Sequence, residues 1–119
     1  MKSKRHLLLL IFMFMTACAW YSTSIKKGEM LFIDPTLGNG TSGKTCNTCH
    51  ENGEGISADF DKKMQYTLMG LELQSLPDLI NNCIEITLRG EEIDPHGEEM
   101  QALINYLQYL QSKKSLTKD

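Results

Sequence analysis

Two cysteines and a histidine form the most chemically suggestive run in the sequence, Cys46-Asn47-Thr48-Cys49-His50. The spacing C-x-x-C-H is typical of covalent haem attachment, because two thiols three residues apart can add to the two vinyl groups of haem. The histidine that follows can reach the iron from the proximal side. We therefore expect Cys46 and Cys49 to carry one covalent haem c, and His50 to be an axial ligand of its iron.

Two other kinds of site also use closely spaced cysteines. A structural zinc site needs a second ligand pair, which the sequence does not supply. A thioredoxin-like redox site needs a strand before the motif and a helix after it. Residues 38–43 and 51–55, which flank the motif, are rich in glycine and polar residues, and we expect both to be loops. These flanking segments favour haem attachment.

The sixth position of a haem iron at this motif has several candidate ligands. Cys83 has no obvious partner thiol, so it is either buried and inert, paired between chains, or an iron ligand. A thiolate would lower the reduction potential, whereas a methionine would raise it. An open sixth position is also possible. The remaining candidate ligands are Met64, Met69, Met100 and His96.

The first 17 residues have the pattern of an export signal. Lys2, Lys4 and Arg5 precede an uninterrupted apolar run over residues 7–15. This run is too short for a membrane-spanning helix, which needs about 20 apolar residues. A buried N-terminal helix is the alternative, but three charges directly before the run disfavour it. We expect residues 1–17 to be a signal peptide.

Small residues directly before Cys18 resemble a bacterial lipobox, with Met15 where leucine is usual. Cleavage before Cys18 would leave its thiol carrying diacylglycerol and would anchor the protein to a bacterial membrane from the periplasmic side. Residues 18–24 would then be a short polar tether. The alternative is ordinary cleavage nearby and a soluble periplasmic protein.

The charge of the exported chain is acidic. Loss of the three basic signal residues from the 12 in the chain leaves 9 against 15 acidic residues, a net charge of −6. Nucleic acids are disfavoured as partners because their phosphates attract lysine and arginine. An acidic surface instead favours redox partner proteins with a basic docking face.

The apolar pattern predicts helices and no strands. A first helix is expected over residues 25–32, ended by Asp34 and Pro35, and another near Asp59 to Met69. The glycine that interrupts the second of these is Gly70.

Two later helices have clearer signals at their ends. Ser75 can cap a helix that has Arg89 in its last turn and Gly90 as its C-cap. For the final helix, Asp94 can be the N-cap and Pro95 the first residue. The apolar stripe of this final helix is Met100, Leu103, Ile104, Leu107 and Leu110.

The predicted fold class is therefore all-α. We expect one small domain over residues 25–114, with three to five helices wrapped around one covalently attached haem, and a polar tail over residues 115–119. About 100 residues provide only a thin core. A covalently bound haem would supply a large apolar centre that short helices can surround.

Residues 28–110 resemble a small class I cytochrome c domain. Residues 28–32 and the C-x-x-C-H motif resemble the first helix and haem loop of many bacterial cytochromes. A second set of residues is similar to the haem domains of thiosulfate dehydrogenases and related sulfur-oxidation cytochromes. This second set comprises residues 80–85, 88–90, 93–94, 98–103 and 106–107.

In that branch, the cysteine that matches Cys83 can coordinate the iron, and related oxygen-binding haem proteins use an asparagine beside it, here Asn82. The chain departs from thiosulfate dehydrogenases in having one haem motif rather than two, and in having Ile86 where they have an arginine. The resemblance therefore supports the cytochrome fold more than it supports an enzymatic activity, and we expect a monohaem electron carrier. The alternatives are a haem subunit or enzyme of sulfur-compound oxidation, a small-ligand binding protein, or a subunit of a larger respiratory complex.

Overall fold

The computed structural model describes residues 6, 19–63, 65–68 and 70–116. Most of the described chain is helical, as predicted, and it also contains a short β-hairpin. An N-terminal helix covers residues 19–32. The elements that follow are the 3₁₀ turn η1 (Leu37–Asn39), α2 (Cys46–Cys49), the 3₁₀ turn η2 (Glu51–Gly53), β1 (Tyr66–Leu68), β2 (Leu71–Leu73), α3 (Leu76–Cys83), the π-helical η3 (Ile84–Leu88) and α4 (Glu98–Leu116).

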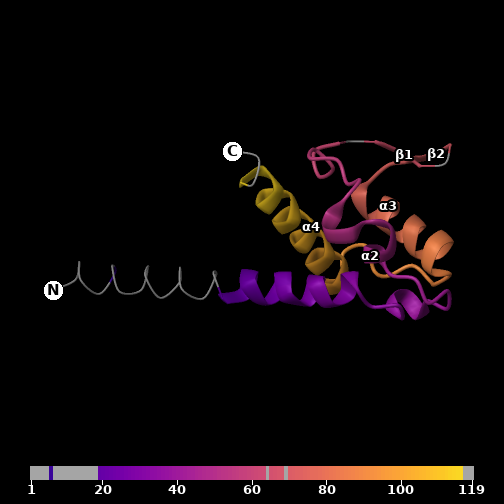
Figure 1. Ribbon diagram of the computed structural model, residues 1–119, viewed down its shortest axis with the longest axis horizontal. Helices are drawn as coiled ribbons and strands as arrows, with labels where there is room; N and C mark the ends of the chain where they lie inside the picture. Colours follow the sequence, from indigo (N-terminus) through magenta and orange to yellow (C-terminus); the bar gives the residue numbers. More distant parts are fainter. Residues whose placement is uncertain (1–5, 7–18, 64, 69, 117–119) are drawn as a thin grey trace.

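The N-terminal helix crosses α4 at a glycine (Figure 1). A Cβ atom on Gly28 would lie 2.0 Å from the carbonyl oxygen of Ala102 and 2.7 Å from Cβ of Tyr106. Only glycine allows the two backbones to approach this closely. One turn further along, the rings of Phe32 and Tyr106 meet edge to face, with their centroids 5.4 Å apart. This crossing forms one half of the core.

The N-terminal helix begins earlier than the sequence predicts. The prediction placed its first residue at Ile25, but residues 19–24, expected as a polar tether, are already helical. The hydroxyls of Ser22 and Thr23 both donate to the carbonyl of Ala19. The predicted signal peptide and Cys18 lie outside the described residues, apart from position 6.

Helix α4 confirms the predicted apolar stripe but begins later than predicted. The Asp94 carboxylate accepts from the backbone N–H of His96 at 2.9 Å, and the Asp94 carbonyl accepts from the N–H of Gly97 at 3.0 Å. These bonds close a turn that includes Pro95, so the helix starts at Glu98 instead. Along the stripe, Ile104 is partly buried and the other four members are buried. At its far end α4 continues to Leu116, into the predicted tail.

Helix α3 begins as predicted, and its end differs. The Ser75 hydroxyl accepts from the backbone N–H of Asp78 at 3.2 Å, which confirms the N-cap. After Cys83 the helix widens into the π-helical η3, which ends at Arg89 in the left-handed region, with φ of 54°. Gly90, predicted as the C-cap, serves close packing instead. A Cβ there would lie 2.5 Å from the carbonyl oxygen of Gly38.

The helix predicted near Asp59 to Met69 is wrong. Strands β1 and β2 pair antiparallel, with Tyr66 opposite Leu73. Gly70 lies in the connecting turn with φ of 84°, a conformation that favours glycine and ends any helix. Met64 and Met69 lie outside the described residues. Among the residues that are described, no helix is both long and apolar enough to cross a membrane.

Candidate functional site

The motif cysteines lie at the two ends of the one-turn helix α2. Thr45 caps it: the Thr45 hydroxyl accepts from the backbone N–H of Thr48 at 3.2 Å, and the Thr48 hydroxyl accepts from the N–H of Thr45 at 3.0 Å. This reciprocal cap fixes a helical turn that is too short to persist alone. Because residues three apart share a face of a helix, the turn presents the thiols of Cys46 and Cys49 on the same side.

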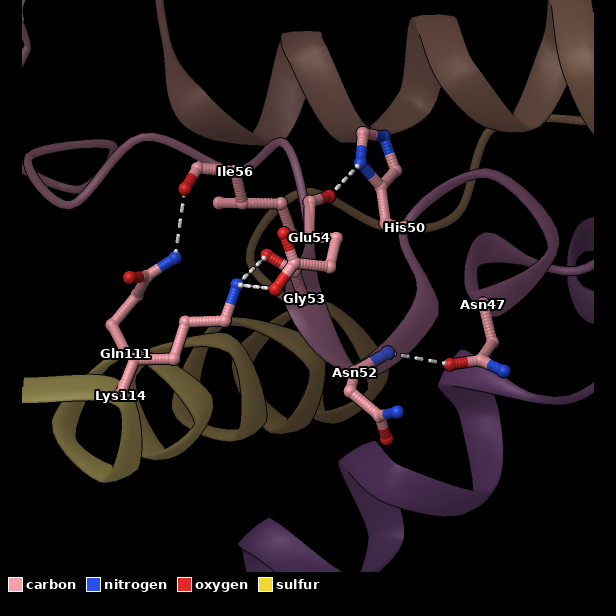
Figure 2. Close-up of polar contacts among 8 residues, drawn as sticks. All are labelled: Asn47, His50, Asn52, Gly53, Glu54, Ile56, Gln111 and Lys114. Carbon is pink, nitrogen blue, oxygen red and sulfur yellow. Dashed lines mark hydrogen bonds and ion pairs between the residues drawn. The ribbon is translucent and has the colours of Figure 1, made fainter. Parts of the chain in front are cut away.

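His50 follows α2 directly, and one of its ring nitrogens is already engaged. Nδ1 lies 3.0 Å from the carbonyl oxygen of Glu54 (Figure 2). A carbonyl can only accept, so Nδ1 carries the proton in this contact and Nε2 keeps a lone pair. A backbone carbonyl on one nitrogen is the usual way in which proteins fix the tautomer of a metal-binding histidine. The contact therefore leaves Nε2, and not Nδ1, as the ring nitrogen of His50 that is available to a ligand.

The loop that holds Glu54 is fastened to the end of α4 (Figure 2). The Lys114 ammonium donates to the carbonyl of Gly53 at 2.8 Å and lies 3.2 Å from the Glu54 carboxylate. The Gln111 amide donates to the carbonyl of Ile56 at 3.0 Å. A side chain near the end of the chain thus sets the position of the histidine.

A cavity of about 580 Å³ opens beside the motif, a size within the range of small-molecule and cofactor sites. Its walls come from five segments: the N-terminal helix, the motif, the loop and β1 that follow it, α3, and α4. Its apolar lining residues are Phe32, Ile56, Phe60, Tyr66, Leu68, Leu76, Leu79, Ile80, Leu103 and Leu107. Such walls exclude water and lower the local dielectric constant.

Two of the predicted cysteines and the predicted histidine line this one cavity. They are Cys46 and His50, from the motif, and Cys83, from the end of α3. Burial raises the pKa of the Cys46 thiol to about 11, with smaller contributions from the Cys83 and Cys49 thiols. Burial and the Cys49 thiol also raise the pKa of Cys83. Cys49 itself is exposed and does not line the cavity.

The other described candidates for an iron ligand lie elsewhere. Met100 is only 1% exposed and belongs to the core, not to the cavity wall. His96 is exposed in the turn before α4. Asn82 has a buried Oδ1 with no hydrogen-bond partner, but it does not line the cavity. Among the described candidates for the sixth position, Cys83 is therefore the one that lines the same cavity as His50.

Sequence reasoning missed two contributions to the site. Phe60, Tyr66, Thr67 and Leu68 line the cavity because the segment predicted as a helix is a hairpin. The alternation of Tyr66, Thr67 and Leu68, ahead of a glycine, was the available signal.

The second missed contribution is Asn81. It is 4% exposed, and its amide donates to the carbonyl of Ile93 at 2.9 Å and accepts from the N–H of Ile93 at 3.1 Å. These two bonds hold α3, which carries Cys83, against the segment that leads into α4. Only the position of Asn81 beside Asn82 and Cys83 hinted at it, and spacing alone could not say which asparagine faces inward.

The residues present fit a covalently attached haem. The Cys46 thiol and the His50 imidazole, whose Nδ1 is engaged, meet a large apolar cavity, and Cys49 follows Cys46 by one turn of α2. A zinc site needs about four ligands, and no group of three or more His, Cys, Asp or Glu side chains comes together for a metal within the described ranges. The chain matches no protein-family model, no curated protein and no solved structure.

Proposed function

We propose that this protein is a monohaem c-type cytochrome of the bacterial periplasm whose function is electron transfer. The observation that supports this proposal best is the meeting of Cys46, His50 and Cys83 at one apolar cavity beside the C-x-x-C-H turn. A thiol pair alone would fit other chemistries. A thiol pair beside a pre-oriented histidine and a cavity of this size fits haem.

Each motif residue then has a distinct role. The Cys46 and Cys49 thiols would hold haem by each adding S–H across one vinyl group, which would form two thioether bonds without a net change in oxidation state. Nε2 of His50 would bind the iron, and the Glu54 carbonyl would orient the imidazole ring and increase its basicity. When bound, haem supplies one-electron exchange between ferric and ferrous iron.

The apolar walls of the cavity would favour such exchange. Side chains held by the protein core reorganise little when a charge changes, whereas water reorients. Leu103 and Leu107 are well suited to this role, because α4 holds both rigidly in the same stripe that packs the core. The protein thus contributes orientation, a low dielectric constant and axial ligands.

Cys83 is the sixth ligand that the described cavity supports. Its thiol lines the cavity with His50, and an iron bond would displace the proton that burial otherwise holds on the sulfur. This position also favours a second candidate function, in which a Cys83-ligated iron oxidises sulfur compounds. Met64 and Met69 remain sequence predictions for the same position.

The N-terminal sequence and the net charge support proposals for the location and the partners of this cytochrome. We propose that a signal over residues 1–17 exports it and that diacylglycerol on Cys18 tethers it to a membrane. The acidic exported chain would dock redox partner proteins that present lysine and arginine.

Haem attachment can be tested by expressing the full chain with a c-type maturation system. We expect a pyridine haemochrome spectrum typical of two thioether bonds, and haem that stays on the chain in a denaturing gel. Replacing both cysteines, Cys46→Ala and Cys49→Ala, should remove that haem. A chain that matures without covalent haem, or a reduced protein without sharp α and β bands, would contradict a low-spin carrier.

The sixth ligand can be tested with Cys83→Ala, using Asn82→Ala as the matched neighbour. A thiolate ligand predicts that Cys83→Ala changes the near-infrared and resonance Raman signatures and raises the reduction potential, whereas Asn82→Ala changes neither. Thiosulfate-dependent haem reduction that is lost in Cys83→Ala would support the enzymatic alternative. Rapid carbon monoxide binding to the unmodified reduced protein would contradict a six-coordinate carrier.

A further inference from the structure

Two aromatic side chains stand in solvent near residue 19, where the described part of the N-terminal helix begins. Trp20 is 80% exposed and Tyr21 is 52% exposed, although aromatic side chains gain much from burial. Figure 1 shows that this end of the helix projects beyond the body of the molecule, on the side away from α2 and the hairpin. The aromatic pair therefore lies far from the candidate haem site.

The composition of this helix end suits an interface between water and lipid. No charged residue occurs from position 19 to 25, and the first charges, Lys26 and Lys27, come about two turns after Trp20. Both lysines are paired, Lys26 with Glu29 at 2.7 Å and Lys27 with Glu98 at 3.1 Å. Tryptophan and tyrosine prefer the headgroup level of a bilayer, where one edge of the ring is wet and the other apolar.

The chain order places this end of the helix beside a membrane. Trp20 and Tyr21 follow the proposed lipidation site Cys18 by two and three residues, so a lipid on Cys18 would hold both side chains close to the bilayer surface. We propose that Trp20 and Tyr21 insert into the headgroup region of the bilayer and hold the N-terminal helix end-on to the membrane. This inference rests on the proposed membrane anchorage and adds the contact that orients the protein.

The distribution of exposed apolar residues distinguishes an end-on from a flat orientation. Met30 is 62% exposed on the same helix. At about 100° per residue, Met30 points about 180° away from Tyr21, nine residues before it, and about 80° away from Trp20, ten residues before it. A helix lying flat could bury Trp20 with Met30 but not all three side chains. The end-on orientation buries the aromatic pair and leaves Met30 about 15 Å further along the helix, in water.

The experiment uses the only tryptophan in the sequence as its probe. The full-length holoprotein is reconstituted in phosphatidylcholine vesicles, with and without bromine atoms at the shallow acyl positions, and then floated. We expect the brominated lipid to reduce Trp20 emission at least about twofold, because an interfacial side chain lies within about 10 Å of those positions. Acrylamide should quench this emission poorly. Comparing paired vesicles cancels any constant quenching by haem.

The matched control moves the tryptophan along the same helix, in the double variant Trp20→Phe with Met30→Trp. Its emission should respond to acrylamide and not to brominated lipid. Equal bromine quenching at both positions would overturn the end-on orientation, and so would the absence of quenching at Trp20 in floated protein. Protein that does not float would overturn the aromatic contact as well as the anchor.

Mass spectrometry of Cys18 separates this inference from the proposed lipid anchor. Floated protein that shows bromine quenching but carries no diacylglycerol would support the aromatic contact and remove the lipid. Floated, lipidated protein without bromine quenching would support the lipid anchor and contradict the aromatic contact. Haem loading, read from the visible spectrum, tests the electron-transfer proposal separately.

Discussion

The two halves of this molecule are assembled in different ways. Where the N-terminal helix crosses α4, backbone meets backbone at Gly28 and the rings of Phe32 and Tyr106 fill the next layer. Between the loop over residues 50–57, the hairpin and α3, the side chains instead surround a cavity of about 580 Å³. The same helix α4 contributes to both halves. One half is packed by its own side chains, and the other encloses a cavity whose volume lies in the range of small-molecule and cofactor sites.

The largest expected loss of stability comes from a substitution that disrupts the crossing of the N-terminal helix and α4. Gly28→Val would place atoms on the Ala102 carbonyl, and backbone atoms cannot move aside cheaply, so we expect the free energy of unfolding to fall by about 3 kcal/mol. Urea unfolding of the holoprotein measures it. Met30→Val, on an exposed position of the same helix, should stay within about 0.5 kcal/mol. Equal losses in the two variants would mean that the crossing does not hold the fold.

The next effect tests what fixes α3 as a cavity wall. Asn81→Ala would leave the buried N–H and carbonyl of Ile93 without partners, at an expected cost of about 2–3 kcal/mol. Asn82→Ala removes an oxygen that has no partner and should cost under about 1 kcal/mol. Chemical denaturation of both variants checks this. Reversed magnitudes would show that Asn82, not Asn81, carries the structural bond.

A third test compares a core residue with a cavity-lining residue one helical turn away. Ile84 is 1% exposed in the core, whereas Ile80 lines the cavity. Ile84→Val should cost about 1 kcal/mol of stability with the haem spectrum unchanged. Ile80→Val should cost less but shift the Soret band and the reduction potential. If both variants left the spectrum unchanged, the cavity would not be the haem site.

The smallest effect concerns the protonation of Cys46 in the chain before haem attachment. Burial raises the folded pKa from 9.0 to about 11. Between these values the unfolded thiol ionises while the folded one stays protonated, so this contribution to stability is complete below pH 9 and is lost as pH rises toward 11. We expect a loss of about 1 kcal/mol between pH 8 and pH 10. Urea unfolding at both pH values measures it, and the loss should shrink in Cys46→Ser.

Much of the fold could be predicted from local sequence signals. Ser75 begins α3 and the stripe of α4 is buried, because caps and 3.6-residue periodicity act within one helix. The prediction was wrong where such signals competed. The Asp94 side chain closes a turn instead of capping a helix, and residues 66–73 form a hairpin rather than extending a helix.

The candidate site divides in the same way. The sequence by itself determined that Cys46 and Cys49 stand about one helical turn apart, and it placed His50 next in the chain. Only the tertiary structure decided that Glu54 engages the outer nitrogen of His50 and that Cys83, rather than Met100, lines the cavity. The physical reason is the distance along the chain over which each kind of interaction acts. Spacing fixes neighbours within a turn, whereas a cavity depends on how distant segments pack.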